Sequence, residues 1–168
     1  MKQTVLKYGL FGFIMAVILF LLALAFGKGL SYSSQEIIGY ATMVASLSFV
    51  FFGIKHYRDN INNGLVTFGK ALLIGVLISV LVGIGIGIAD YLYTTMINPN
   101  FSQEFLETSI SNLENSVTGE ELESKKEELI AYMNNYGSSE FLAFIMFSTV
   151  LIIGFIISLI SALILQRK

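Results

Sequence analysis

A small group of basic side chains offers the widest range of chemistry in this sequence. Lys55, His56 and Arg58 end one long apolar segment, and Lys70 lies in the first turn of the next. The C-terminus of a helix favours cations, and the free N–H groups at a helix N-terminus favour an anion. We therefore hypothesise that Lys55, Arg58 and Lys70 together contact a lipid phosphate or an anionic group of a partner.

Other interpretations of this basic turn need no bound anion. Arg58 can pair with the adjacent Asp59, although an exposed ion pair adds little stability. Basic residues that flank membrane spans also fix the orientation of a membrane protein, and this requirement alone accounts for them. An enzyme that acts through His56 and Arg58 at this surface is a third interpretation.

The composition excludes several kinds of chemistry. The 168 residues include no cysteine and one histidine, which excludes disulfides, thiolate ligands, cysteine nucleophiles and histidine-based zinc sites. Serines in the apolar segments have no histidine or aspartate at comparable depth to activate them. We therefore expect no enzyme activity and no cofactor. The net charge of −2 gives no reason to expect nucleic acid binding.

Four apolar segments must position the basic turn. The chain is 55% hydrophobic and 13% charged, whereas a soluble domain is about 25% charged. A helix of about 20 residues crosses the hydrocarbon layer, which is roughly 30 Å thick. We predict a single membrane domain over residues 1–168, with an all-α, four-helix bundle fold. The predicted spans cover about 8–26, 37–54, 68–93 and 141–165.

The first span has an alternative interpretation as a cleaved signal peptide. Ala23-Leu24-Ala25 resembles a cleavage site for signal peptidase. The apolar run is longer than the usual apolar region of a signal peptide, which has about 7–15 residues. This length favours a retained span.

Local residue types indicate where the second and third spans begin. Ser34 is a typical N-cap for the second span, and Thr67 is one for the third. Asn63 and Gly64 both accept a positive φ, which a tight turn between the two spans requires. Asp90 is the acidic residue that lies deepest in any span. We expect the helix to continue past Asp90 into water, and contact with a cation or a partner is the functional alternative.

An insert of different composition, residues 94–139, separates the third and fourth spans. It contains the only proline, Pro99, and eight of the twelve acidic residues. Apolar residues recur there at near-helical spacing in two stretches. The residues 118–121 form a capping-box pattern at the start of the second stretch, and residues 134–137 supply its end. We predict an extracytoplasmic hairpin of two amphipathic helices. Its glutamates show no calcium-loop pattern, so a solvated charged face is the favoured interpretation.

Small residues recur every four positions in the third and fourth spans. In lipid, such residues let two helix backbones approach and gain van der Waals contact. The partner can be another span of the same chain or a second copy of the chain. The residues that we predict to pack in this way are Ala71, Gly75, Ser79, Gly83 and Gly87, together with Gly154, Ser158 and Ala162.

The distribution of basic residues predicts the orientation. The positive-inside rule places the side with more Lys and Arg in the cytoplasm. Both termini and the turn at residues 55–70 are therefore expected to be cytoplasmic, and the acidic hairpin external. Seven basic residues lie on one side, Lys2, Lys7, Lys55, Arg58, Lys70, Arg167 and Lys168, and three lie on the other, Lys28, Lys125 and Lys126.

The chain also resembles a known bacterial membrane family. The resemblance is carried by Gly53–Asp59 with Gly64 and Phe68–Ala71, by Glu36–Tyr40, and by the ending Ile157–Ile164. The family is the domain of unknown function forty-one ninety-nine, and the resemblance covers nearly the whole chain. It implies a four-span integral membrane protein, and it carries no known activity, substrate or catalytic residue.

These observations predict a non-enzymatic integral membrane protein of the bacterial cytoplasmic (inner) membrane. We expect an interaction or scaffold protein, or an accessory subunit of the cell envelope. The expected partners are membrane lipids and either a second copy or another membrane protein. A small oligomeric transporter or channel is the alternative, which a polar stripe shared by several spans would favour. Only scattered hydroxyl groups are present in the spans.

Overall fold

The computed structural model of the chain describes residues 1–27, 30 and 32–167. Lys28 and Lys168, which contribute to the predicted orientation, lie outside the described residues. The chain forms two compact units. One unit comprises Met1–Ala89 and Ile145–Lys168, and we call it the membrane unit. The other comprises Asp90–Phe144, and we call it the insert unit.

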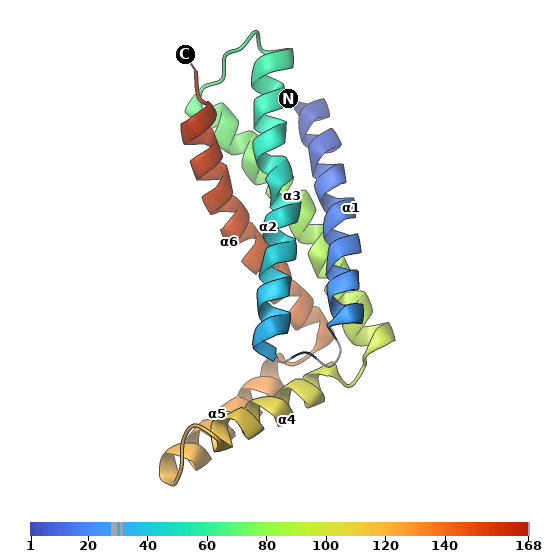
Figure 1. Cartoon of the computed structure of the whole chain (residues 1–168), viewed down its shortest axis with the longest axis vertical. Coiled ribbons are helices and arrows are strands. Elements are labelled where there is room, and N and C mark those ends of the chain that lie inside the picture. Colours follow the sequence, from blue (N-terminus) through green and yellow to red (C-terminus); the bar gives the residue numbers. More distant parts are fainter. Residues whose placement is uncertain (28–29, 31, 168) are drawn as a thin grey trace. The chain divides into compact units, whose positions relative to one another are not determined.

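Four long α-helices supply the apolar segments, and the predicted all-α fold is confirmed. Each is long and apolar enough to cross a membrane, as in a multi-pass membrane protein. Figure 1 shows the N-terminus, the C-terminal end and the loop between α2 and α3 at the same end of the membrane unit. The four helices are α1 (Lys2–Phe26), α2 (Tyr32–His56), α3 (Phe68–Leu92) and α6 (Ser139–Leu165).

The first two helices begin earlier than predicted. α1 includes the polar residues from Lys2 on, since lysine and glutamine are good helix formers. α2 begins at Tyr32, so the prediction that Ser34 caps this helix is wrong. Gln35 donates a hydrogen bond from Nε2 to the Leu30 carbonyl at 3.0 Å. This bond connects the first turn of α2 to the backbone that precedes it. α3 begins directly after Thr67, as predicted.

α2 and α3 each continue into a five-residue π-helical turn with the same local chemistry. These turns are η1 (Tyr57–Ile61) and η2 (Tyr93–Ile97). In each, the first residue is a buried tyrosine, and its carbonyl accepts the backbone N–H of the asparagine that ends the turn. Wider helical turns of this kind are rare and often lie at functional sites. The pattern Tyr-x-x-x-Ile-Asn thus ends both helices in the same way.

The core of the membrane unit is apolar and centres on α3. Ile74, Ile78, Val82 and Ile86 of this helix are fully buried. They pack in one cluster with residues of the other three helices, among them Leu47, Val50, Val150 and Ala162. Several buried hydroxyl groups in the long helices donate to the carbonyl four residues earlier in the same helix, which satisfies them without a partner on another helix. Examples are Ser46 to Thr42 at 2.9 Å, Ser79 to Gly75 at 2.9 Å and Ser158 to Gly154 at 2.6 Å.

The insert unit contains the predicted pair of helices, α4 (Phe101–Glu114) and α5 (Glu120–Tyr136). Ser102 Oγ donates to the Gly137 carbonyl at 2.7 Å, and Lys126 pairs with Glu114 at 2.8 Å, so side-chain contacts link the two helices at two places. The predicted capping box at residues 118–121 is wrong. Gly119 is the N-cap, and its φ of 71° sets the turn without a side-chain cap. The extracytoplasmic location of this hairpin stays a prediction.

Candidate functional site

The basic turn lies at one end of the membrane unit, and Arg58 is its most constrained cation. Its guanidinium lies 2.5 Å from Asp59 Oδ1 through Nε and 3.1 Å from Asp59 Oδ2 through Nη2. Its Nη1 also donates to the Leu165 carbonyl at 3.4 Å. The side chain is only 11% exposed. Arg58 therefore pairs with Asp59, as one interpretation of the sequence proposed, and it also stabilises the last turn of α6.

A second contact joins the same turn to the C-terminal end of the chain. Val66 and Arg167 form an antiparallel β-bridge, with N–H to carbonyl distances of 2.9 Å and 2.8 Å. The turn reaches this bridge through Asn63 and Gly64, which both have a positive φ as expected. Val66 is 1% exposed, so the bridge closes the core at this end.

The other two cations of the predicted anion site lie on the surface of the same turn. Lys55 and Lys70 are both exposed, and the Lys70 ammonium lies 5.7 Å from the centre of the Tyr57 ring. This distance is within the range of a cation–π interaction. The charges of Lys55 and Arg167 also act on the Asp59 carboxylate. An added anion would have to compete with Asp59 for Arg58, and the binding hypothesis for Lys55, Arg58 and Lys70 stays a prediction.

His56 contributes to the contact between α1 and α2. Its ring lies 5.3 Å from the Tyr8 ring, measured between centroids. Its Nδ1 lies 3.1 Å from Asn60 Nδ2, within hydrogen-bonding distance. The histidine therefore contributes to the packing of two helices, and the residue as a whole is half-buried.

Asp90 has a different environment from the one expected. The prediction that the helix carries it into water is wrong, because Asp90 is only 7% exposed. Its Oδ2 is buried without a hydrogen-bond partner among the described residues. The backbone carbonyl of Asp90 accepts a bond from Thr94 Oγ1 at 3.0 Å, where α3 passes into η2. A buried carboxylate without a partner is energetically costly, so this position is unusual within a candidate span.

The small residues of α3 and α6 face each other within one chain. A Cβ atom added to Gly75 would lie 2.5 Å from Ser158 Oγ, and one on Gly154 would lie 2.5 Å from Ser79 Cβ. A Cβ atom on Gly83 would lie 3.0 Å from the Phe147 ring. Of the remaining predicted packing residues, Ala71 and Ala162 are fully buried, whereas Gly87 is half-buried.

Sequence reasoning missed a second set of close approaches, which involve α1. Gly12 lies under Val82 of α3, since an added Cβ atom would lie 2.6 Å from Val82 Cγ2. Gly9 faces Leu81, and Gly85 approaches the backbone of Phe13. Small residues at positions 9, 12 and 16 share one helical face, and this spacing could have indicated the contact.

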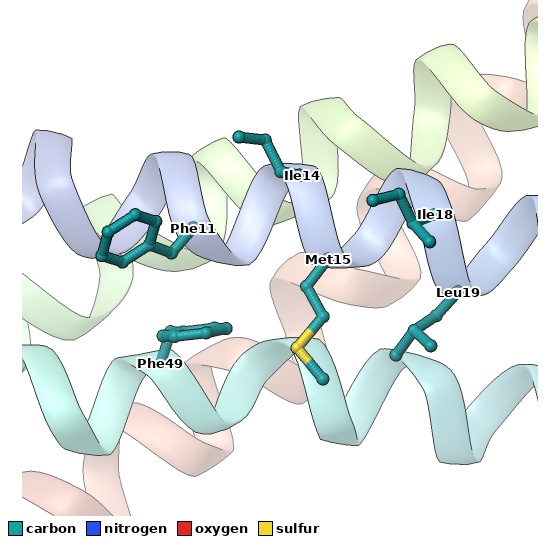
Figure 2. Close-up of a pocket in the computed structure, with 6 residues that line it drawn as sticks. All are labelled: Phe11, Ile14, Met15, Ile18, Leu19 and Phe49. Carbon is teal, nitrogen blue, oxygen red and sulfur yellow. The ribbon is translucent and has the colours of Figure 1, made fainter.

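An apolar groove on the membrane unit is the other feature that sequence reasoning missed. The hollow has a volume of about 330 Å³ and opens to the outside between α1 and α2. Figure 2 shows Phe11 and Phe49 at one end, with Met15 and Leu19 reaching from α1 toward α2. All the lining side chains are apolar, and they are Phe11, Ile14, Met15, Ile18, Leu19 and Phe49.

Comparison with known proteins identifies a family for the chain. A family model described as protein of unknown function (DUF4199) matches residues 7–167 of the chain. No curated protein and no solved structure matches the chain.

Proposed function

Because the chain belongs to the DUF4199 family of proteins of unknown function, we propose a role that rests on its membrane surfaces. In this proposal the protein is a non-enzymatic scaffold or accessory subunit of the bacterial cell envelope. Its partners are membrane lipids and other membrane proteins, which include further copies of the same chain.

The observation that carries this proposal is the closed, apolar core of the membrane unit. The small residues of α3 and α6 meet each other within one chain, so they need no second copy to cover them. Large apolar side chains remain exposed on the outer faces of α1, α2 and α6. In α6 these include Ile152, Phe155, Ile156, Ile160 and Leu163. Such faces can contact lipid or the spans of another protein.

The arrangement of basic residues supports a cytoplasmic location for both termini. The two ends of the chain and the loop between α2 and α3 lie at one end of the membrane unit (Figure 1). Lys7, Lys55, Arg58, Lys70 and Arg167 belong to these segments. A cluster of Lys and Arg at one end is typical of the cytoplasmic side. We therefore propose the bacterial cytoplasmic membrane as its location.

Photo-crosslinking in cells tests the scaffold role. A photoreactive amino acid at Ile156, which is 51% exposed, should yield a discrete adduct with another protein. The same probe at the fully buried Ile78 is the matched control and should yield none. If probes along the outer face of α6 yield lipid adducts alone, this face has no stable protein partner and the proposal fails.

A small oligomeric transporter or channel is the second candidate, and Asp90 favours it. This acid is buried in a candidate span, and ionisable residues in such positions commonly belong to ion or proton pathways. Flux measurements with purified protein in sealed vesicles separate the two candidates. Solute or cation flux above that of protein-free vesicles, abolished by Asp90→Asn, would favour transport. Flux equal to that of protein-free vesicles would favour the scaffold.

A further inference from the structure

The apolar groove between α1 and α2 continues toward a lysine on the same stripe of α1. Lys7, Phe11, Ile14 and Ile18 follow one another at intervals of three or four residues, so they share one helical face. Lys7 is exposed, and its ammonium lies 5.7 Å from the Tyr8 ring centroid. One positive charge thus lies one helical turn before Phe11, the first residue of α1 that lines the groove. We propose that the groove holds one acyl chain of an anionic phospholipid, with the lipid phosphate at Lys7.

The walls of the groove are formed by rings and by flexible side chains. The Phe11 and Phe49 rings lie 6.1 Å apart, tilted by 48°. Figure 2 shows these two rings beside Met15 and Leu19, which extend from α1 along the same hollow. Gly12 lies directly beneath, and an added Cβ atom there would lie 3.7 Å from Phe49 Cβ. The absence of a side chain at Gly12 lets α1 approach its neighbours closely. The Phe11 and Phe49 rings lie above this contact and form the wall of the hollow.

The dimensions of the groove match a hydrocarbon chain better than a helix. From Phe11 to Leu19 it follows α1 for about 12 Å. A hollow of about 330 Å³ over that length has a mean cross-section of roughly 30 Å². A helix with its side chains is about 10 Å across, so its cross-section is more than twice as large. The groove therefore accommodates one acyl chain along its length, whereas only individual side chains of a facing helix would enter it.

The residues near the Lys7 end of the groove are of the types found at the interface between membrane and water. The Tyr8 ring lies 6.3 Å from Phe11 and 5.3 Å from His56, so aromatic rings separate the groove from the polar end. Tyrosine is enriched at the interface between membrane and water, where lysine contacts phosphates. If an acyl chain occupies the groove, the phosphate of the same lipid would therefore lie beside Lys7.

Charge must select the lipid, because the acyl chain alone cannot. Lipid tails are as apolar as the groove, so occupancy gains only van der Waals packing relative to the bulk bilayer. A lysine near an anionic surface contributes about 1 kcal/mol, which corresponds to a preference of about five-fold. The inference rests on the membrane location of α1 and α2, and it does not depend on the scaffold role.

Tryptophan fluorescence tests the proposal, since the chain contains no tryptophan. Phe49→Trp places one probe in the wall of the groove. Phe155→Trp places a matched probe on the outer face of α6, where the native side chain is 47% exposed. Each variant is reconstituted in phosphatidylcholine vesicles that contain a brominated lipid, whose acyl chains quench nearby tryptophan. The brominated lipid is phosphatidylglycerol in one sample and phosphatidylcholine in the other. Phe11→Trp is a second groove probe if Phe49→Trp does not fold.

The measured quantity is the ratio of quenching by brominated phosphatidylglycerol to quenching by brominated phosphatidylcholine. We expect this ratio to indicate a preference for phosphatidylglycerol of about five-fold at the groove probe and no preference at position 155. Adding Lys7→Gln should remove the preference, while Lys2→Gln should preserve it, because Lys2 lies on another face of α1. Equal ratios at the two probes, or a preference that Lys7→Gln leaves unchanged, would overturn the proposal. Protection of the groove probe from both brominated lipids would also overturn it, because a protein surface would then cover the groove.

Discussion

Ser79 of α3 and Gly154 of α6 fit each other so closely that a Cβ atom on the glycine would lie 2.5 Å from the serine Cβ. The pairing recurs in reverse one turn away, where Gly75 of α3 faces Ser158 of α6. Both serines donate their hydroxyl to their own helix, so neither requires a polar partner across the interface. The contact between the two helices is therefore one of shape, as close packing in lipid requires.

Enlarging a glycine in this contact should weaken the membrane unit. Gly75→Leu or Gly154→Leu would force the helices apart, and overpacking of this kind costs about 1–3 kcal/mol or more. Ile84→Leu is the control, because Ile84 is 40% exposed and keeps its volume. Thermal unfolding in detergent should show a lower midpoint for the glycine variants alone. Equal midpoints for all variants would contradict the packing geometry.

A double mutant tests the pairing more directly. Gly154→Ala adds one Cβ atom against Ser79, and Ser79→Gly removes the atom that it meets. The combined variant should recover part of the stability that Gly154→Ala loses, since residues in contact have non-additive effects. Gly154→Ala combined with Ile84→Leu, a pair without this contact, should show additive changes instead.

The sequence predicted the elements of this fold better than their contacts. Four apolar runs suffice to identify α1, α2, α3 and α6, because the bilayer requires long apolar helices. The spacing of small residues marked Gly75 and Gly154 as positions of close approach, but it did not specify the pairing with Ser158 and Ser79. That pairing depends on how two distant helices align, which no local pattern encodes.

In the candidate site, too, contacts between sequence neighbours were predicted, whereas contacts between distant segments were missed. The pair of Arg58 and Asp59 involves neighbours, and it was among the interpretations of the sequence. The bond from Arg58 to the Leu165 carbonyl joins segments that are distant in sequence, so it was missed. The predicted caps at Ser34 and in residues 118–121 were wrong, because Gln35 and Gly119 provide alternative local structure.

Reporter labelling should test the proposed orientation. The chain has no cysteine, so Asn62→Cys and Glu120→Cys each introduce a single reactive thiol. In intact cells, a membrane-impermeant thiol reagent should label position 120 and leave position 62 unlabelled until the membrane is disrupted. The opposite pattern would reverse the orientation that we propose.

Arg58 should stabilise the C-terminal end of α6. Arg58→Gln removes the paired contact with Asp59 and weakens the bond to the Leu165 carbonyl. We expect faster hydrogen exchange at the amides of the last turn of α6, because this turn loses its contact with η1. Lys55→Gln changes a nearby exposed charge and should leave that exchange unchanged. Equal exchange in both variants would mean that the Val66–Arg167 bridge alone holds this end.

The insert unit should lose stability at alkaline pH. The hydrogen bond with Glu114 raises the pKa of Lys126 above its ordinary value of 10.5. A folded-state pKa above the unfolded value stabilises the fold while the pH is below the unfolded pKa, and this contribution is lost as the pH rises through the folded value. The difference in unfolding midpoint between the parent chain and Lys126→Gln should therefore be constant near neutral pH and shrink as the pH rises past the unfolded-state value and through the higher folded-state pKa. Lys125→Gln is the control for the loss of one exposed lysine charge, because the pair of Lys125 with Glu121 lies within a single helix.

The buried carboxylate of Asp90 should lower the stability of the folded protein. Its Oδ2 has no hydrogen-bond partner among the described residues, and a buried polar group in that state costs about 1–3 kcal/mol. Asp90→Leu replaces the carboxylate with an apolar side chain of the same branching, so the unfolding midpoint in detergent should rise. Asp59→Leu is the matched control, and it should lower the midpoint because it removes the partner of Arg58. A lower midpoint for Asp90→Leu would instead show that the carboxylate has a favourable partner in the folded protein. Combined with loss of flux in vesicles, that outcome would favour an ion-conducting role over the scaffold.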